Sequence, residues 1–167
     1  MHIRTGTDTD VDAAAEIWQA AHHARLGFAP DGARKDRAMA VLVARLALPD
    51  ARFLIAERDG SAIGMLLACQ ARENDGAGLQ MPGLLHISYV ATHPDYWGRG
   101  VASQLLADIA SKARAMHNDA LQLWVVTNNA RARALYERCG FAFTGREKID
   151  DYGEPIVHYR MELRGSP

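Results

Sequence analysis

A glycine-rich turn between an apolar run and a long helix-forming segment constrains this chain more than any other feature. Residues 84–93 are largely apolar, Pro94 ends the run, and Gly98 and Gly100 precede an Ala/Leu-rich segment. The first amides of a helix have no carbonyl partner within it, and the helix dipole favours negative charge there. Glycine lets a ligand approach such amides closely because it has no Cβ. The pattern therefore predicts a strand, a phosphate-binding turn and a helix.

Two other phosphate-binding patterns do not fit this turn. No Gly-Lys-Ser/Thr follows it, which argues against a P-loop. Gly98-x-Gly100 lacks the third glycine of the dinucleotide fingerprint, and no acidic residue stands about 20 positions further on at a strand end.

The composition is typical of a folded globular protein. A length of 167 residues with 49% hydrophobic and 23% charged residues predicts one domain over residues 1–167. The net charge of −1 argues against a nucleic-acid partner. The N-terminus does not resemble a signal peptide and no apolar run is long enough to span a membrane, so we expect a cytoplasmic protein with no membrane partner. Cys69 and Cys139 form no CxxC pair and are expected to be free thiols.

Hydrophobic periodicity, caps and breakers predict the elements. Asp8 or Thr9 is expected to cap the first helix, Gly27, Pro30, Asp31 and Gly32 to end it, and residues 73–83 to form a loop. The predicted strands are 2–6, 52–57, 61–72, 84–93, 120–126, 141–147 and 155–163. The first predicted helix begins near residue 10, and the other three cover residues 34–48, 100–116 and 129–139. The predicted order is βααβββαβαββ.

A second motif lies in the predicted helix 129–139. The segment Asn128–Phe141 reads N-N-A-R-A-R-A-L-Y-E-R-C-G-F, with Gly140 suited to a helix C-terminus. It resembles the N-x-x-A-x-x-x-Y-x-x-x-G-F segment of the GCN5-related N-acetyltransferases (GNAT). The turn Trp97–Ala102 resembles the Q/R-x-x-G-x-G/A acyl-CoA motif of the same family, with Trp97 in place of the usual Gln or Arg.

The resemblance implies an α/β (α+β) fold, with a mixed, mostly antiparallel sheet and helices on both faces. It also implies acetyl-CoA as co-substrate, Asn129 as a contact of the pantetheine arm, and Tyr136 as the general acid that protonates the leaving thiolate. The backbone of the central strand would pair with the pantetheine amides and donate to the thioester carbonyl. The implied cofactor-binding residues, besides Asn129 and Tyr136, are Val90, Ala91, Thr92, Trp97, Gly98, Arg99, Gly100, Val101, Ala102 and Ser103.

The general base is left open by the sequence. Some family members carry a Glu at the strand position of Trp124, which cannot accept a proton. Others carry it at the position of His86, whose ordinary pKa near 6.5 suits proton removal. Ser88 shares a strand face with His86 and could hold a relaying water. Glu73 and His158 are the alternatives.

The acceptor is expected to be a small-molecule or peptide amine, and the protein a monomer or homodimer. The acidic turn at Asp150, Asp151 and Glu154 predicts a cationic amine. His22 and His23 are adjacent on a helix and point in different directions, so no metal site is predicted. A non-catalytic acyl-CoA-binding sensor is the alternative function, and an RNA-modifying acetyltransferase is disfavoured by the net charge of −1.

Overall fold

The computed structural model describes residues 1–27 and 32–163, and for residues 33–35 and 38 the backbone alone. Its contacts divide into two compact units. The first contains Met1–Cys69 and Tyr89–Asp108, and the second contains Gln70–Ser88 and the chain from Ile109 onward. That the whole chain is one domain stays a prediction.

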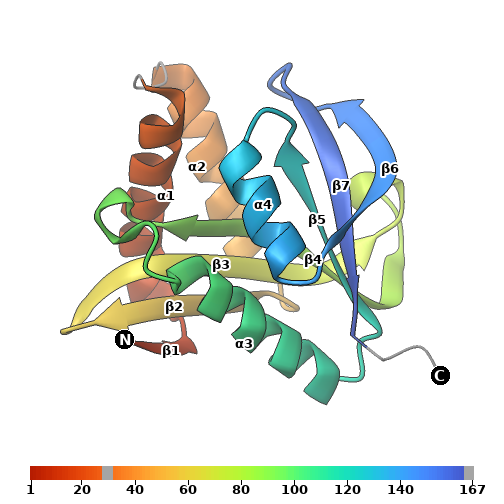
Figure 1. Cartoon of the computed structure of the whole chain (residues 1–167), viewed down its shortest axis with the longest axis horizontal. Coiled ribbons are helices and arrows are strands. Elements are labelled where there is room, and N and C mark those ends of the chain that lie inside the picture. The colour runs from red at the N-terminus through yellow and green to blue at the C-terminus, as the bar shows by residue number, and fades with distance from the viewer. Residues whose placement is uncertain (28–31, 164–167) are drawn as a thin grey trace. The chain divides into compact units, whose positions relative to one another are not determined.

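The described residues form a mixed sheet, and the predicted fold class is confirmed (Figure 1). The strands hydrogen-bond in the order β1-β2-β3-β4-β5-β7-β6, with β4–β5 parallel and the pairs β1–β2, β2–β3, β5–β7 and β6–β7 antiparallel. The elements in chain order are β1 (His2–Thr5), α1 (Val11–Leu26), α2 (Gly32–Leu46), β2 (Arg52–Arg58), β3 (Ser61–Arg72), β4 (Gln80–Thr92), α3 (Val101–Ala115), β5 (Ala120–Val126), α4 (Ala130–Arg138), β6 (Ala142–Ile149) and β7 (Pro155–Glu162), with short 3₁₀ turns at Asp8–Asp10, Asn74–Gly76 and Pro94–Tyr96.

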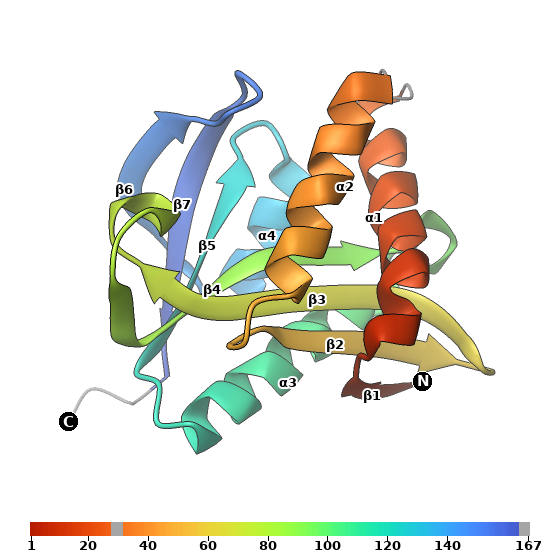
Figure 2. The same ribbon diagram turned by 180° about the vertical axis from the view of Figure 1, so that it is seen from behind.

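In the first unit, helices α1 and α2 lie side by side over one face of β2 and β3 (Figure 2). The apolar stripes of the two helices bury Ile17 and Leu42 in one cluster with side chains of the strands, including Ile55 and Met65. Burial of such a cluster is the main favourable term in folding. The first half of α3 packs on the opposite face, where Val101 lies against Gly64.

In the second unit, a short parallel ladder joins β4 to β5. It pairs Leu84–Ile87 with Ala120–Leu123. Strand β7 then pairs with β5 along seven residue pairs from Ala120↔Glu162 to Val126↔Ile156. Helix α4 contacts β7 through Tyr136, whose ring centroid lies 6.4 Å from that of Tyr159.

Three predicted boundaries were wrong. Neither Asp8 nor Thr9 caps α1, because these residues form a 3₁₀ turn and the Thr7 N–H donates to the Asp10 carboxylate at 2.8 Å. Gly32 begins α2 instead of breaking a helix. Pro30 and Asp31 lie outside the described residues.

The third correction concerns the start of β4, which begins at Gln80, so the loop before it ends at Leu79 rather than at Gly83. Hydrogen bonds from distant residues hold the added segment in an extended form. The Gly83 carbonyl accepts from the Asp119 N–H at 2.7 Å, and the Gln70 side-chain amide donates to the Leu84 carbonyl at 2.9 Å and to that of Met81. The periodicity of a sequence cannot reveal hydrogen-bond partners that are distant along the chain.

Gly64 controls how closely α3 approaches β3. A Cβ at this position would lie 2.7 Å from Cγ1 of Val101 and 3.2 Å from the Ala91 carbonyl oxygen. Valine is stiff at χ1, so the contact is costly to relieve. We expect Gly64→Ala to lower the free energy of unfolding by about 1–3 kcal/mol in urea titration. Gly32→Ala, which meets nothing within 4 Å, should cause no loss, and equal stability of the two variants would contradict the close contact.

Candidate active site

The glycine turn lies in the first unit, between the 3₁₀ turn Pro94–Tyr96 and α3. Gly98 and Gly100 have φ values of 76° and 79°, which L side chains rarely adopt, and a Cβ at either would meet nothing within 4 Å. The Gln104 N–H donates to the Gly100 carbonyl at 3.0 Å and closes the first turn of α3. The amides of Val101, Ala102 and Ser103 precede that bond and have no helical acceptor. The turn thus combines open space with amide donors that have no backbone acceptor among the described residues, which suits a phosphate.

Trp97 anchors this turn to the strand before it. Its indole N–H donates to the Thr92 carbonyl at 2.7 Å. The residue that departs from the family motif therefore has a role in holding the turn in place. Arg99 is exposed, and its guanidinium carbon lies 5.4 Å from the centroid of the Tyr96 ring, which orients a positive charge beside the glycines.

The end of β4 offers backbone and one hydroxyl. The Ala91 side chain packs into the cluster beneath α1 and α2, so Ala91 can present only its backbone to a ligand. Val90 is half-buried. Thr92 is buried, and its hydroxyl oxygen has no hydrogen-bond partner among the described residues. A buried hydroxyl without a partner costs free energy, so Thr92 suits a ligand group or an ordered water.

The second motif forms the start of α4 in the second unit. The Asn129 side-chain oxygen accepts from the Ala132 N–H at 3.2 Å and caps the helix. This leaves the side-chain NH₂ without a hydrogen bond to the described part of the chain. Asn129 can therefore cap α4 and donate to a ligand at the same time.

Tyr136 is buried, with 7% of its surface exposed. Its ring packs edge-on against Phe141 at a centroid distance of 5.9 Å, and its hydroxyl makes no hydrogen bond within the described residues. Burial, followed by the electrostatic effect of the nearby Cys139, raises the pKa of Tyr136 well above its ordinary value. The phenol is thus held protonated, which is the form that a general acid requires.

His86 and Ser88 lie on β4, and both are half-buried. His86 stands in register with Gln122 of β5, and Trp124 in register with His158 of β7. Residues that pair across neighbouring strands point to the same face of the sheet, and so does every second residue along one strand. The side chains of His86, Ser88, Trp124 and His158 therefore lie on one face. Tyr159, which contacts Tyr136, lies on the other face. The sheet of this unit thus separates the candidate bases from the candidate acid.

His158 is a weaker candidate base than its residue type suggests. It is buried, with Nδ1 2.8 Å from the Thr144 hydroxyl and Nε2 3.1 Å from the Gln122 side-chain oxygen. Burial, with the charge of Arg146, lowers the pKa of His158 to about 4. Its affinity for a proton is therefore low. Glu73 is exposed, and its backbone pairs with the Leu79 carbonyl in the loop before β4.

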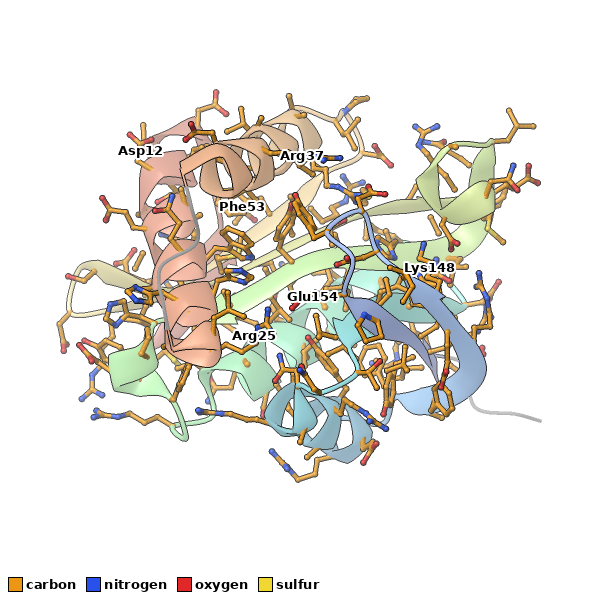
Figure 3. The ribbon with its side chains drawn as sticks, turned by 90° about the horizontal axis from the view of Figure 1, so that it is seen from above. Asp12, Arg25, Arg37, Phe53, Lys148 and Glu154 are labelled. Atoms are coloured by element: carbon orange, nitrogen blue, oxygen red, sulfur yellow. The ribbon has the colours of Figure 1, made fainter. Side chains whose placement is uncertain are left out.

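The acidic turn between β6 and β7, where Glu154 is labelled in Figure 3, is built around the carboxylate of Asp150. An Asp150 side-chain oxygen accepts from the amides of Tyr152 at 2.9 Å and Glu154 at 2.8 Å. Asp150 therefore shapes the turn and keeps its negative charge, and attraction of a cationic amine by Asp150, Asp151 and Glu154 stays a prediction.

A group that sequence reasoning missed surrounds Trp124. Arg146 and Lys148 of β6 lie over its ring, with the charged atoms 5.2 Å and 4.6 Å from the centroid. Both also pair with Asp75 of the Asn74–Gly76 turn, at 3.2 Å and 3.1 Å. The spacing of Arg146 and Lys148 indicates a shared strand face, but no sequence signal places the distant Asp75 beside them.

Within residues 1–27 and 32–163, no grouping of His, Cys, Asp and Glu could hold a metal ion. Neither Cys69 nor Cys139 forms a disulfide bond within the described residues. None of the described helices is long and apolar enough to cross a membrane.

Comparisons with known proteins show the family to which the chain belongs. The model of the Acetyltransferase (GNAT) family matches residues 12–141. The chain is 33% identical over 136 residues to the mycothiol acetyltransferase of Brachybacterium faecium, covering 80% of this chain but only 39% of that protein. It is 35% identical over 117 residues to the IAA acetyltransferase of Azospirillum brasilense, covering 70% of each. The structure of YncA from Salmonella typhimurium, solved with its cofactor acetyl-CoA, superposes with a TM-score of 0.72 at 23% identity, covering 100% of this chain and 96% of that one.

The chain therefore belongs to the GNAT family of acetyltransferases. The resemblance inferred from the two motifs is confirmed.

Asn129 gives a direct test of the local geometry. Asn129→Ala removes the acceptor for the Ala132 N–H and should lower the free energy of unfolding by about 1 kcal/mol. Asn129→Asp keeps the acceptor and should retain the stability, because a carboxylate at a helix N-terminus is favourable. Urea titration of the three proteins is the measurement. An alanine variant as stable as the original would contradict the cap.

Proposed function

We propose that this protein transfers the acetyl group of acetyl-CoA to the primary amine of a small molecule or peptide. The observation that carries the proposal is the Gly98–Gly100 turn, with open space at both glycines and unpaired amides at the start of α3. Acetyl-CoA carries a pyrophosphate, and such amides favour its charge. We assign the pyrophosphate to residues 98–103 and the pantetheine arm to Asn129 and the backbone of residues 90–92.

The chemistry needs two proton transfers. The amine nitrogen attacks the thioester carbonyl carbon, the carbon–sulfur bond breaks, and the sulfur leaves as a thiolate. Tyr136 is assigned to protonate or hydrogen-bond that thiolate, because its hydroxyl has no partner among the described residues. Burial keeps the phenol neutral, so its hydroxyl is available as a hydrogen-bond donor to the thiolate.

The incoming ammonium must lose a proton before it attacks. We assign this step to His86, directly or through a water held by Ser88. His158 shares the same sheet face, but a pKa of about 4 makes it a poor acceptor of a proton from an amine. His86 is therefore preferred.

A non-catalytic acyl-CoA-binding sensor is the alternative. Trp124 supports it, because this residue stands where some relatives are expected to carry a Glu base. Release of coenzyme A thiol from acetyl-CoA, measured across a panel of amines and confirmed by product mass, distinguishes the two. Acetyl-CoA binding without any acetylated amine would favour the sensor.

The first prediction concerns the phosphate site. Gly100→Asp places a carboxylate beside the unpaired amides and should weaken acetyl-CoA binding at least tenfold, about 1.4 kcal/mol, in calorimetry. Gly60→Asp is the matched control. Gly60 also has a φ of 79° and nothing within 4 Å, but it lies in the β2–β3 hairpin. Equal affinities in the two variants would remove the pyrophosphate from this turn.

The second prediction concerns Tyr136. Tyr136→Phe keeps the ring contacts with Phe141 and Tyr159 but loses the hydroxyl. An interaction made only in the transition state lowers kcat and leaves binding unchanged. We expect kcat to fall by about 10²–10⁴ with unaltered acetyl-CoA affinity and unfolding free energy.

The pH profile gives a further check of the same residue. Because burial raises the pKa of Tyr136, its acid form persists as pH rises. The wild-type kcat should therefore show no loss from tyrosine ionisation below about pH 10, the ordinary tyrosine pKa. A wild-type kcat in Tyr136→Phe would show that the residue is structural.

A further inference from the structure

The group around Trp124 forms a positively charged surface within the second unit. Arg146 and Lys148 both lie over the indole ring, and both pair with the single carboxylate of Asp75. Two cations thus share one anion. The side chains of Arg146 and Lys148 remain 55% and 35% exposed, so a second anion can reach them.

The pairing of β6 with β7 positions Arg146 and Lys148 beside Trp124. The β6–β7 register shifts between Phe143 and Glu147, and Gly145 within the shift has a φ of 82°. The irregularity sets both Thr144 and Arg146 near His158, and Lys148 pairs with Ile156 further along β7. From there the two cations reach across β7 to the ring of Trp124 on β5.

Trp124 also has a defined place relative to the proposed chemistry. The parallel ladder between β4 and β5 ends at the pair Ile87↔Leu123, and Trp124 is the next residue of β5. Trp124 is two residues after Gln122, the partner of His86, so its side chain lies on the same face as those of His86 and Ser88. These are the candidate base and the residue proposed to hold a water. The two cations therefore lie on the face from which the proposed amine would be deprotonated.

Asp75, which pairs with both cations, lies in a turn with an unusual backbone conformation. Asn74 and Asp75 have φ values of 50° and 54°, a backbone region that non-glycine residues seldom adopt. Burial opposes ionisation of Asp75, but hydrogen bonds and charge from Lys148 and Arg146 outweigh it, so its pKa lies below the ordinary value. Asp75 is thus an anion at neutral pH and competes with any other anion for the same two partners.

We propose that Arg146 and Lys148 form a carboxylate-binding subsite, so that the acceptor is an amine that also carries a carboxylate, such as an amino acid. The role as acceptor site rests on the proposed function, but the binding of an anion does not. A carboxylate satisfies a guanidinium and an ammonium by charge-assisted hydrogen bonds, and the indole provides an apolar surface beside them. Asp75 then sets the affinity, because the ligand must share or displace its carboxylate.

The test compares each acid with its neutral amide. N-acetylglycine and N-acetylglycinamide, and N-acetyl-L-phenylalanine and its amide, are titrated calorimetrically into the protein at low ionic strength, with and without coenzyme A. We expect each acid to bind at least fivefold more tightly than its amide, and the difference to shrink with added salt.

Removing the cations and removing Asp75 should change the affinity for the acids in opposite directions. Arg146→Gln and Lys148→Gln should each weaken acid binding at least fivefold, roughly 1 kcal/mol. Asp75→Asn should strengthen it, a gain that misfolding would not produce. Arg138→Gln is the matched control, because it removes an equal charge from an exposed position of α4, the helix that packs on the opposite, Tyr159 face of the sheet.

Equal affinities of acid and amide, no binding of either acid, or a weaker complex in Asp75→Asn would overturn the carboxylate subsite. These results leave the proposed acetyl transfer intact, since that is judged by thiol release. Selective binding of the acids without acetylation of any amine would instead support the anion site and reject the proposed function.

Discussion

The parallel ladder between β4 and β5 is the constraint on which the sheet of the second unit depends. It contains four residue pairs, from Leu84↔Ala120 to Ile87↔Leu123. The pairs β1–β2, β2–β3, β5–β7 and β6–β7 are antiparallel. Because the two strands run in the same direction, each continues past the last pair toward its own motif. Strand β4 leads to the glycine turn, and β5 leads to Asn129 and α4. Parallel strands require a long crossover, and α3 provides it. The close approach of Val101 to Gly64 in turn ties the start of that crossover to β3.

Both motifs present backbone and neutral donors in preference to fixed charges. The glycine turn offers the first amides of α3, held in place by the Trp97 indole bond to the Thr92 carbonyl. Asn129 uses its oxygen to cap α4, which leaves its NH₂ as a donor, and Tyr136 is kept as a neutral phenol by burial. Donors that are fixed before a ligand arrives need no reorganisation when charge develops, which is why such sites can be effective with few ionised groups. In the second unit, the charged side chains of Arg146 and Lys148 lie on the face of the sheet that carries His86.

The sequence predicted the local structure around both motifs well, because each motif is short and continuous. Gly98, Gly100, Asn129 and Tyr136 stand at the ends of elements whose periodicity and caps can be read directly. The prediction was weaker wherever a residue works with distant partners. The sequence suggested that Asp150 attracts a substrate, whereas its carboxylate binds two amides of its own turn. It suggested His158 as a base, whereas burial and Arg146 lower its pKa to about 4. Strand β4 begins earlier than predicted because Asp119 and Gln70 supply hydrogen bonds from other elements.

The amino-acid sequence by itself determined the class of fold, the family, and the local geometry of both motifs. The local geometry follows from periodicity, glycine conformation and helix capping, which act over a few neighbouring residues. The class of fold and the family were inferred from the resemblance of the two motifs to those of the GNAT family. Only the tertiary structure decided which charges meet. Asp75, Trp124, Arg146 and Lys148 come from a turn and two strands that are far apart in the chain, and a register shift in β6 aims Arg146 toward His158. Electrostatic partners are set by distance in space and by burial, and neither quantity is encoded in local sequence spacing.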